Sequence, residues 1–264
     1  MSRITVNDAS LYYEEHGTGE PILCIHGTGS STALWRAPAG VLATRGRTIV
    51  YDRRGFGESE RPEPFVSNVQ LHTDDAAALL DAVEAAPAIV IGRSQGGEIA
   101  VDLALRYPDR VRALALLEGG GMSLSPEFGR WLAGVHERLF AAAEADPGTV
   151  GEAFLREVLG DAAWDELPQV VQEVFIANSP AILAEERAEL LGVTAAELGT
   201  IPHPTLIVGA RDSGPEFAEA TELTAKAMPS ARVEWVEGGH LIDAGHPAVL
   251  AFVDDVLADV LVHR

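Results

Sequence analysis

Short hydrophobic runs recur along the chain, and a stretch with helical spacing follows most of them. Runs rich in Val, Ile and Leu between Gly, Pro or polar residues are typical of buried strands, whereas apolar residues three and four positions apart are typical of helices. The expected strands cover residues 4–6, 11–14, 22–25, 48–51, 89–91, 113–117, 206–208 and 233–236, and the expected helices cover 32–43, 69–85, 98–107, 216–227 and 248–262. This alternation predicts an α/β fold with a mainly parallel sheet flanked by helices.

Residues 122–200 interrupt the alternation, because their apolar positions follow helical spacing and contain no clear strand-like run. Helix punctuation occurs at residues 146–148, 167–168 and 179–180, where proline ends or begins each helical pattern. We therefore expect a core built from residues 1–121 and 201–264, with residues 122–200 inserted as a helical cap, or lid.

The composition narrows the class of protein. A chain of 264 residues, 47% of them hydrophobic, is long enough to bury a large core. Nineteen basic and 40 acidic residues give a net charge of −21, which opposes binding to nucleic acid or anionic membranes. The single cysteine, Cys24, lies in an apolar run and is expected to pack in the core.

The N-terminal residues lack a signal-peptide pattern, and no apolar run reaches membrane-spanning length. We expect a cytoplasmic protein whose partner is a small, neutral and partly apolar molecule.

The stretch Val90–Gly97, VIGRSQGG, sets an apolar run against a serine with a glycine two positions away on each side. A serine on a very tight turn between a strand and a helix leaves no room for side chains at those two positions. Gly92 and Gly96 therefore predict a turn that displays the hydroxyl of Ser94 as a nucleophile.

A serine hydroxyl is a weak nucleophile near neutral pH, so it needs a general base oriented by a carboxylate. His240 follows the last expected strand on a glycine-rich loop, at the strand end where ligands gather in open α/β sheets. His246 is the nearest rival, but it precedes Pro247 at the expected start of a helix and fits that structural role better. We predict His240 as the base.

Two carboxylates compete for the role of orienting acid. Asp212 follows the strand before the histidine loop, and Glu118 ends the strand that comes after the serine helix. Neighbouring strand ends lie about 5 Å apart, so distance alone does not decide which side chain reaches His240. Asp212 has the fuller motif and is favoured, while Glu118 stays open as the alternative.

The tetrahedral intermediate of acyl transfer needs amide donors that face its oxyanion. Gln95, directly after the serine, supplies one amide, and Thr28 in the glycine loop after an early strand supplies the other. His26, two residues earlier, is expected to support the loop structurally.

Taken together, these segments resemble the α/β-hydrolase superfamily, and specifically its small cap-bearing group of esterases, lactonases and carbon–carbon bond hydrolases. The resemblance covers nearly the whole chain and rests on five motifs: His26-Gly27, residues 52–59 (DRRGFGES), the serine turn, Gly209 to Asp212, and Gly239-His240. It implies an eight-stranded sheet, a helical cap, and neither a metal nor an organic cofactor. It does not name a substrate.

Cleavage of a carboxylic ester or lactone through an acyl-enzyme is the leading prediction, because a serine at this turn disfavours the related reactions that use a carboxylate nucleophile. Carbon–carbon bond hydrolysis and cofactor-free perhydrolase chemistry use the same triad and stay open, as does a non-catalytic ligand-binding role. A dinucleotide-binding motif starting at Gly27 is disfavoured, because Thr32 stands where the third glycine is needed. Trp35, Trp131 and Trp164 are predicted to line an apolar substrate pocket.

Overall fold

The computed structural model describes residues 2–262, and within them a single eight-stranded sheet forms the centre of the protein. The apolar runs seen in the sequence account for the strands, which extend the expected runs by one to a few residues at their ends. The strands are β1 (Ser2–Val6), β2 (Ala9–His16), β3 (Pro21–Ile25), β4 (Arg47–Tyr51), β5 (Ala88–Arg93), β6 (Val111–Leu117), β7 (Thr205–Ala210) and β8 (Arg232–Val236).

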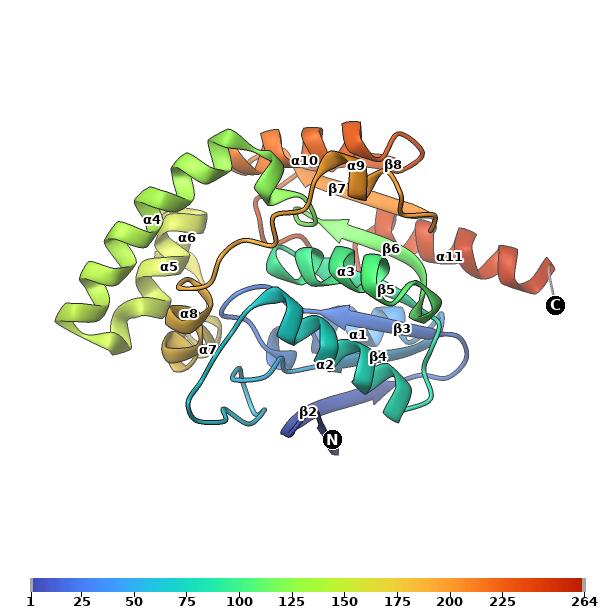
Figure 1. Cartoon of the computed structure of the whole chain (residues 1–264), viewed down its shortest axis with the longest axis horizontal. Helices are drawn as coiled ribbons and strands as arrows, with labels where there is room; N and C mark the ends of the chain where they lie inside the picture. The colour runs from blue at the N-terminus through green and yellow to red at the C-terminus, as the bar shows by residue number, and fades with distance from the viewer. Residues whose placement is uncertain (1, 263–264) are drawn as a thin grey trace.

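The strand order in the sheet is β1-β2-β4-β3-β5-β6-β7-β8. The pairs β1–β2 and β2–β4 are antiparallel, and every other neighbouring pair is parallel. The carboxyl ends of β3, β5, β6, β7 and β8 therefore lie along the same edge of the sheet, so that the loops after them meet there (Figure 1).

Helices cover both faces of the sheet, as the prediction of an α/β fold requires (Figure 1). These core helices and turns are η1 (Thr32–Leu34), α1 (Arg36–Leu42), α2 (Val69–Ala82), α3 (Gln95–Arg106), η2 (Pro108–Arg110), α10 (Pro215–Ala227) and α11 (Pro247–Val262). The expected helix over residues 32–43 is instead a short η1 turn followed by α1, and Trp35 separates the two.

Successive side chains of a strand point to opposite faces of the sheet, so the core consists of two apolar clusters, one on each face. In the central strand β5, Val90 packs in the apolar cluster beneath α2 and α3, whereas Ile89 and Ile91 pack in the cluster beneath α1 and α11. Cys24 belongs to the second cluster and is buried, which agrees with the packing role expected for it; burial raises the pKa of its thiol. The inner strands β3, β5, β6 and β7 are almost wholly buried because helices cover both faces of the sheet.

Residues 122–200, between β6 and β7, form helices and turns, and the described residues of this interval contain no strand. These elements are η3 (Met122–Leu124), α4 (Pro126–Ala145), η4 (Pro147–Thr149), α5 (Val150–Leu159), α6 (Asp161–Glu166), α7 (Gln169–Ala177), α8 (Ser179–Glu185) and α9 (Ala195–Leu198). Their apolar faces pack together in a cluster that includes Val135, Leu139, Phe154 and Phe175. Figure 1 shows α4 to α8 grouped beside one end of the core.

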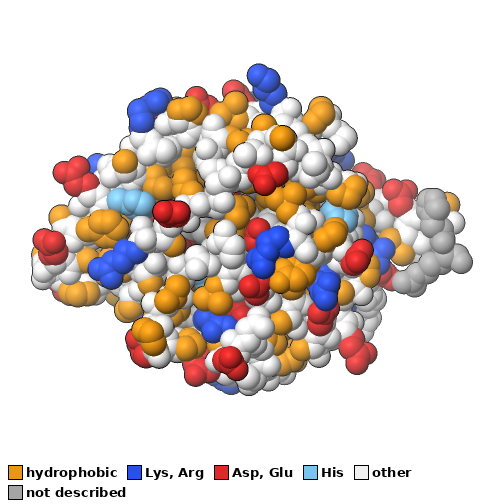
Figure 2. All heavy atoms as spheres, in the orientation of Figure 1, with side chains coloured by type: hydrophobic (Ala, Val, Ile, Leu, Met, Phe, Trp, Pro, Cys, Tyr) orange, Lys and Arg blue, Asp and Glu red, His pale blue; other side chains and the backbone are white. Residues whose placement is uncertain are grey.

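None of the helices formed by residues 2–262 is both long enough and apolar enough to cross a membrane. In Figure 2, acidic side chains are distributed across the visible face, and the basic side chains there lie scattered among acidic and hydrophobic ones. This distribution is what the large excess of acidic residues in the sequence predicts.

Candidate active site

Ser94 occupies the turn between β5 and α3, and its backbone is strained. Its φ of 54° and ψ of −124° lie in a region that non-glycine residues rarely adopt. A Cβ atom on Gly92 would lie 2.2 Å from the carbonyl oxygen of Gly96, and one on Gly96 would lie 2.1 Å from that of Ile25. The two glycines are therefore needed for the close approach of the turn to its neighbours, as their spacing in the sequence predicts.

His240 is 4% exposed, and its Nδ1 atom lies 2.8 Å from Oε2 of Glu118. The ring of Phe217 packs against the imidazole, with the ring centroids 4.0 Å apart. The carboxylate and the aromatic ring together restrict the orientation of His240. Sequence reasoning missed Phe217, because its position in a helix gives no indication of the histidine loop that it contacts.

Glu118 directly follows β6 and has a φ of 45°, which lies in the left-handed region and ends the extended strand conformation. Besides His240, its carboxylate accepts hydrogen bonds from the backbone amide of Ala210 at 2.8 Å and from the hydroxyl of Ser213 at 2.7 Å. These three donors hold the carboxylate in one place. Glu118 therefore has the geometry required of an acid that orients a histidine.

The expectation that favoured Asp212 needs a correction. Asp212 is exposed, and its Oδ2 atom accepts a hydrogen bond from the amide of Gly238 at 3.1 Å. It lies beyond the end of β7 and braces the loop that leads to His240, without contacting the imidazole. The alternative residue, Glu118, occupies the position that we had expected for Asp212.

A second buried carboxylate supports the loop after Glu118. Glu98 in α3 accepts hydrogen bonds from the amides of Gly120 and Met122, both at 2.9 Å. Burial raises the pKa of Glu98, while the bonds from these amides act in the opposite direction. Glu98 thus holds the glycine-rich loop that follows Glu118. An acidic residue on the apolar face of α3 was the signal in the sequence.

Thr28 and Gln95 belong to two segments that meet at the serine turn. Gln95 is the first residue of α3, so its amide is one of the free donors at the positive end of that helix. Thr28 lies in the loop after β3, where a Cβ atom on Gly27 would lie 2.9 Å from the carbonyl oxygen of Arg93 and 3.1 Å from Cβ of Ser94. His26 supports this loop as expected, because Nδ1 lies 2.8 Å from the Gly27 carbonyl and Nε2 accepts a bond from the Arg53 amide.

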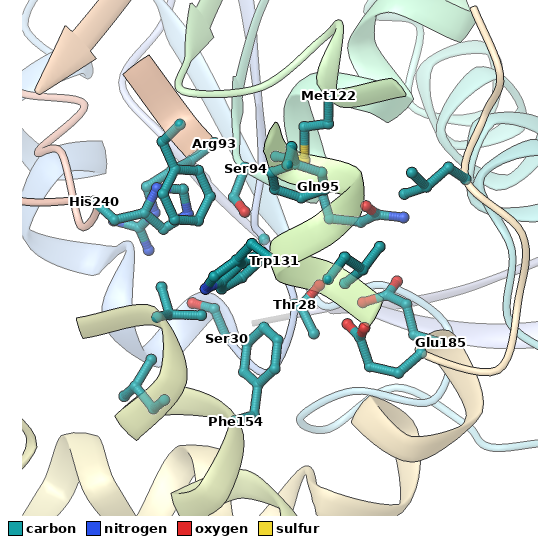
Figure 3. Close-up of a pocket in the computed structure, with 18 of the residues that line it drawn as sticks. Thr28, Ser30, Arg93, Ser94, Gln95, Met122, Trp131, Phe154, Glu185 and His240 are labelled. Atoms are coloured by element: carbon teal, nitrogen blue, oxygen red, sulfur yellow. The ribbon is translucent and has the colours of Figure 1, made fainter. Parts of the chain in front are cut away.

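Ser94, His240, Thr28 and Gln95 all line one pocket, which encloses about 840 Å³ of empty space including its open part (Figure 3). The other walls are mainly apolar side chains from residues 122–200 together with Phe217. They include Met122, Phe128, Trp131, Leu132, Phe154, Leu155, Val158 and Phe175. The pocket thus brings a strained serine, a histidine and backbone amides together against an aromatic surface.

Of the three tryptophans predicted to line the pocket, only Trp131 does so. Trp35 is 2% exposed and belongs to the cluster beneath α1 and α11, on the other side of the sheet from α3. Trp164 is 4% exposed and packs inside the cluster of residues 122–200. Contrary to the prediction, Trp35 and Trp164 do not line this pocket, because both side chains pack inside apolar clusters.

Arg93, directly before the nucleophile, is buried and faces the ring of Trp35, with 5.1 Å from the guanidinium carbon to the ring centroid. Burial lowers the pKa of Arg93 to about 10, so the side chain stays charged near neutral pH. One guanidinium nitrogen donates to the carbonyl of Ile242 at 3.3 Å. This contact joins the serine turn to the segment that follows His240.

Two buried histidines near the site predict a loss of stability in acid. Burial, followed by the charge of Arg53, lowers the pKa of His26 and of His72 well below the ordinary value. The unfolded chain protonates these rings near pH 6.5, so below that pH it binds protons that the folded protein does not. These rings therefore leave stability unchanged above about pH 7.5, and below about pH 6.5 each lowers it by up to about 1.4 kcal/mol per pH unit.

Urea unfolding at a series of pH values tests this expectation. The His72→Gln variant keeps a side-chain amide that can bond to Ser67, the present partner of the ring at 2.8 Å. We expect its free energy of unfolding to fall less steeply than that of the unmodified protein between pH 6.5 and 5. Equal slopes for the two proteins would contradict the assignment.

Comparison with known proteins identifies the family of the chain. Residues 20–161, just over half of the chain, match the family model described as the alpha/beta hydrolase fold. The chain belongs to the α/β-hydrolase family. This α/β-hydrolase is 32% identical to a candidate carbamate hydrolase of Azorhizobium caulinodans, over 92% of each chain. It is 31% identical to the 2-hydroxymuconate semialdehyde hydrolase of Pseudomonas sp. strain CF600, over 93% of this chain and 89% of that relative.

Among solved structures, the α/β-hydrolase resembles a thermophilic esterase from Thermogutta terrifontis. The TM-score is 0.79, with 24% sequence identity over 98% of this chain and 99% of the esterase. At this identity the likeness shows a shared fold. The predicted superfamily and the predicted mainly parallel eight-stranded sheet are thus confirmed.

Proposed function

We propose that this α/β-hydrolase is a serine hydrolase that cleaves a carboxylic ester or a lactone through an acyl-enzyme. Ser94 is the nucleophile, His240 the general base and Glu118 the orienting acid. The observation that carries the proposal is the 2.8 Å contact between His240 and Glu118, in a pocket that also exposes the strained Ser94 turn. A buried pair of this kind, next to a displayed serine, is the arrangement that activates a hydroxyl.

In the proposed reaction, Oγ of Ser94 attacks the substrate carbonyl while Nε2 of His240 takes the hydroxyl proton. Glu118 holds the Nδ1–H of the imidazole and stabilises the positive charge that forms on the ring. The amides of Thr28 and Gln95 donate to the oxyanion. His240 then protonates the leaving alcohol, and a water molecule, activated by the same histidine, hydrolyses the acyl-enzyme.

The walls of the pocket support an apolar or aromatic substrate portion. Trp131, Phe128 and Phe217 pack in contact, with ring centroids 5.2 to 5.7 Å apart, and all three line the pocket. Burying an apolar group against these rings contributes about 25 cal/mol for each Å² removed from water. Because most of the wall comes from residues 122–200, we also propose that this interval acts as the cap and sets the choice of substrate.

Carbon–carbon bond hydrolysis is a second candidate, supported by the 31% identity to the 2-hydroxymuconate semialdehyde hydrolase. The same serine, histidine and amides serve both reactions. The two differ in the bond that breaks, so a panel of simple esters, lactones and vinylogous diketones separates them: the proposed function requires faster turnover of the esters or lactones.

Labelling with a fluorophosphonate tests the proposed nucleophile. Such reagents phosphonylate activated serines, so we expect one covalent adduct per chain, located by mass spectrometry on the peptide that contains Ser94. Glu118→Gln should slow the labelling strongly, because the base loses its orienting partner. An unlabelled protein, or an adduct on another serine, would favour a non-catalytic binding role.

A further inference from the structure

One polar side chain from residues 122–200 reaches the loop that carries Thr28. Asn178 lies between α7 and α8 and is 3% exposed. Its Nδ2 donates to the carbonyl of Gly29 at 2.9 Å and to the carbonyl of Ser30 at 3.2 Å. Its Oδ1 accepts a bond from the amide of Gly57 at 2.9 Å. The amide group of Asn178 therefore joins the Thr28 loop to the loop after β4.

An apolar contact also connects the Thr28 loop to residues 122–200. Gly29 has a φ of +73°, and a Cβ atom there would lie 2.5 Å from Cδ1 of Phe175 and 2.9 Å from Cδ1 of Ile182. Both side chains belong to the apolar cluster of residues 122–200. The Thr28 loop thus contacts residues 122–200 through close apolar packing as well as through the hydrogen bonds of Asn178.

On the Gly27 side of Thr28 the loop is held by His26, but on the Ser30 side its own polar contacts are weak. The turn bond from the amide of Ser30 to the carbonyl of Gly27 is long, at 3.3 Å. The hydroxyl of Ser30 is buried in the pocket wall and has no hydrogen-bond partner among the described residues. The two carbonyls bound by Asn178 belong to the residues directly after Thr28. They lie in the Gly29–Ser30 and Ser30–Ser31 peptide planes, whereas the Thr28 amide lies in the Gly27–Thr28 plane, whose carbonyl contacts His26. Asn178 therefore anchors the second half of the loop and limits how far the loop can shift as a unit.

We propose that Asn178 is a positioning residue for the oxyanion donors. The inference rests on the proposed function, since it assigns the amide of Thr28 to the oxyanion. The cap then contributes to the chemical step by holding that amide in place, in addition to forming the wall of the pocket. A donor displaced by about 1 Å loses much of its benefit in the transition state, while the bound substrate is affected much less.

The experiment compares two Asn178 variants with a neighbouring control. Asn178→Asp is nearly isosteric and keeps the acceptor for Gly57, but it replaces the donor by an oxygen that faces two carbonyls. Asn178→Ser keeps a shorter donor and is used as well, in case the aspartate variant does not fold. Ser179→Ala removes an equally buried side chain, whose hydroxyl bonds to Gly151, Gly148 and Ile176 within the cap.

We expect Asn178→Asp to lower kcat for an ester substrate by about 10- to 100-fold, with KM changed by less than about threefold. Binding of a boronic acid, which imitates the tetrahedral intermediate, should weaken by a similar factor. Asn178→Ser should lose less, and Ser179→Ala should keep kcat within about threefold while its melting temperature falls.

Three results would overturn the proposal: a folded Asn178→Asp or Asn178→Ser variant with unchanged kcat, a change confined to KM, or an equal loss of kcat in Ser179→Ala. Failure of the underlying function is distinguishable, because the unmodified protein would then not be labelled at Ser94 by the fluorophosphonate.

Discussion

Replacing Ser94 by alanine is expected to lower the turnover of an ester or lactone substrate by roughly three to six decades. The variant removes the atom that forms the acyl-enzyme and leaves the amides of Thr28 and Gln95 and the pocket walls in place. Residual activity then comes only from bound water attacking a polarised carbonyl. Initial rates of the purified variant and the unmodified protein, measured at equal concentration, give the ratio directly.

The fold of the Ser94→Ala variant should be unaffected. Alanine keeps the Cβ atom, so the strain at φ 54° does not change, and the Ser94 side chain makes no capping hydrogen bond to α3. Ser94→Gly is a useful companion, because glycine adopts this conformation freely and should raise stability by about 1 kcal/mol while being equally inactive. Retention of more than a tenth of the turnover by either folded variant would exclude Ser94 as the nucleophile.

The second large effect is expected at Glu118. Glu118→Gln should lower kcat by roughly three to four decades, because an amide facing Nδ1 of His240 no longer favours the tautomer that leaves Nε2 free to accept the serine proton. The glutamine can still accept from the amide of Ala210, so the end of β6 should keep its structure. Steady-state kinetics with a thermal melt of each protein separate the catalytic loss from unfolding.

Asp212→Asn is the matched control, since it makes the same carboxylate-to-amide change at the other candidate position. The asparagine oxygen can still accept the bond from the amide of Gly238, so we expect less than a tenfold change in kcat. If Asp212→Asn lowers kcat by three to four decades and Glu118→Gln does not, the roles that we propose for the two acids must be exchanged.

Sequence periodicity predicted the strands of the sheet because each of them is a local apolar run. The runs around Ile22, Ile89 and Leu114 are apolar at every position, which is typical of parallel strands covered on both faces, and all three lie in the centre of the sheet. The spacing of Gly92, Ser94 and Gly96 was equally informative, because a tight turn excludes side chains at fixed offsets along the chain.

The choice between Asp212 and Glu118 depended on registration between strands that are far apart in sequence. Leu117 pairs with Val208, and the amide of Glu118 bonds to the Val208 carbonyl, so Glu118 emerges level with the interior of β7. Asp212 follows the end of β7 by two residues and lies in solvent. No local sequence pattern predicts the position of Glu118 relative to β7, because the packing of β6, β7 and the His240 loop sets it.

What the sequence by itself determined is therefore local: the strand and helix runs, the serine turn and the family to which the chain belongs. Tertiary structure alone decided which carboxylate meets His240, that Trp131 faces the pocket while Trp35 and Trp164 do not, and that Asn178 contacts the Thr28 loop. Each of these depends on which faces of distant elements meet. A residue's neighbours in the chain restrict its backbone conformation and the face of the helix or strand on which its side chain lies. They do not specify which remote surface packs against that face.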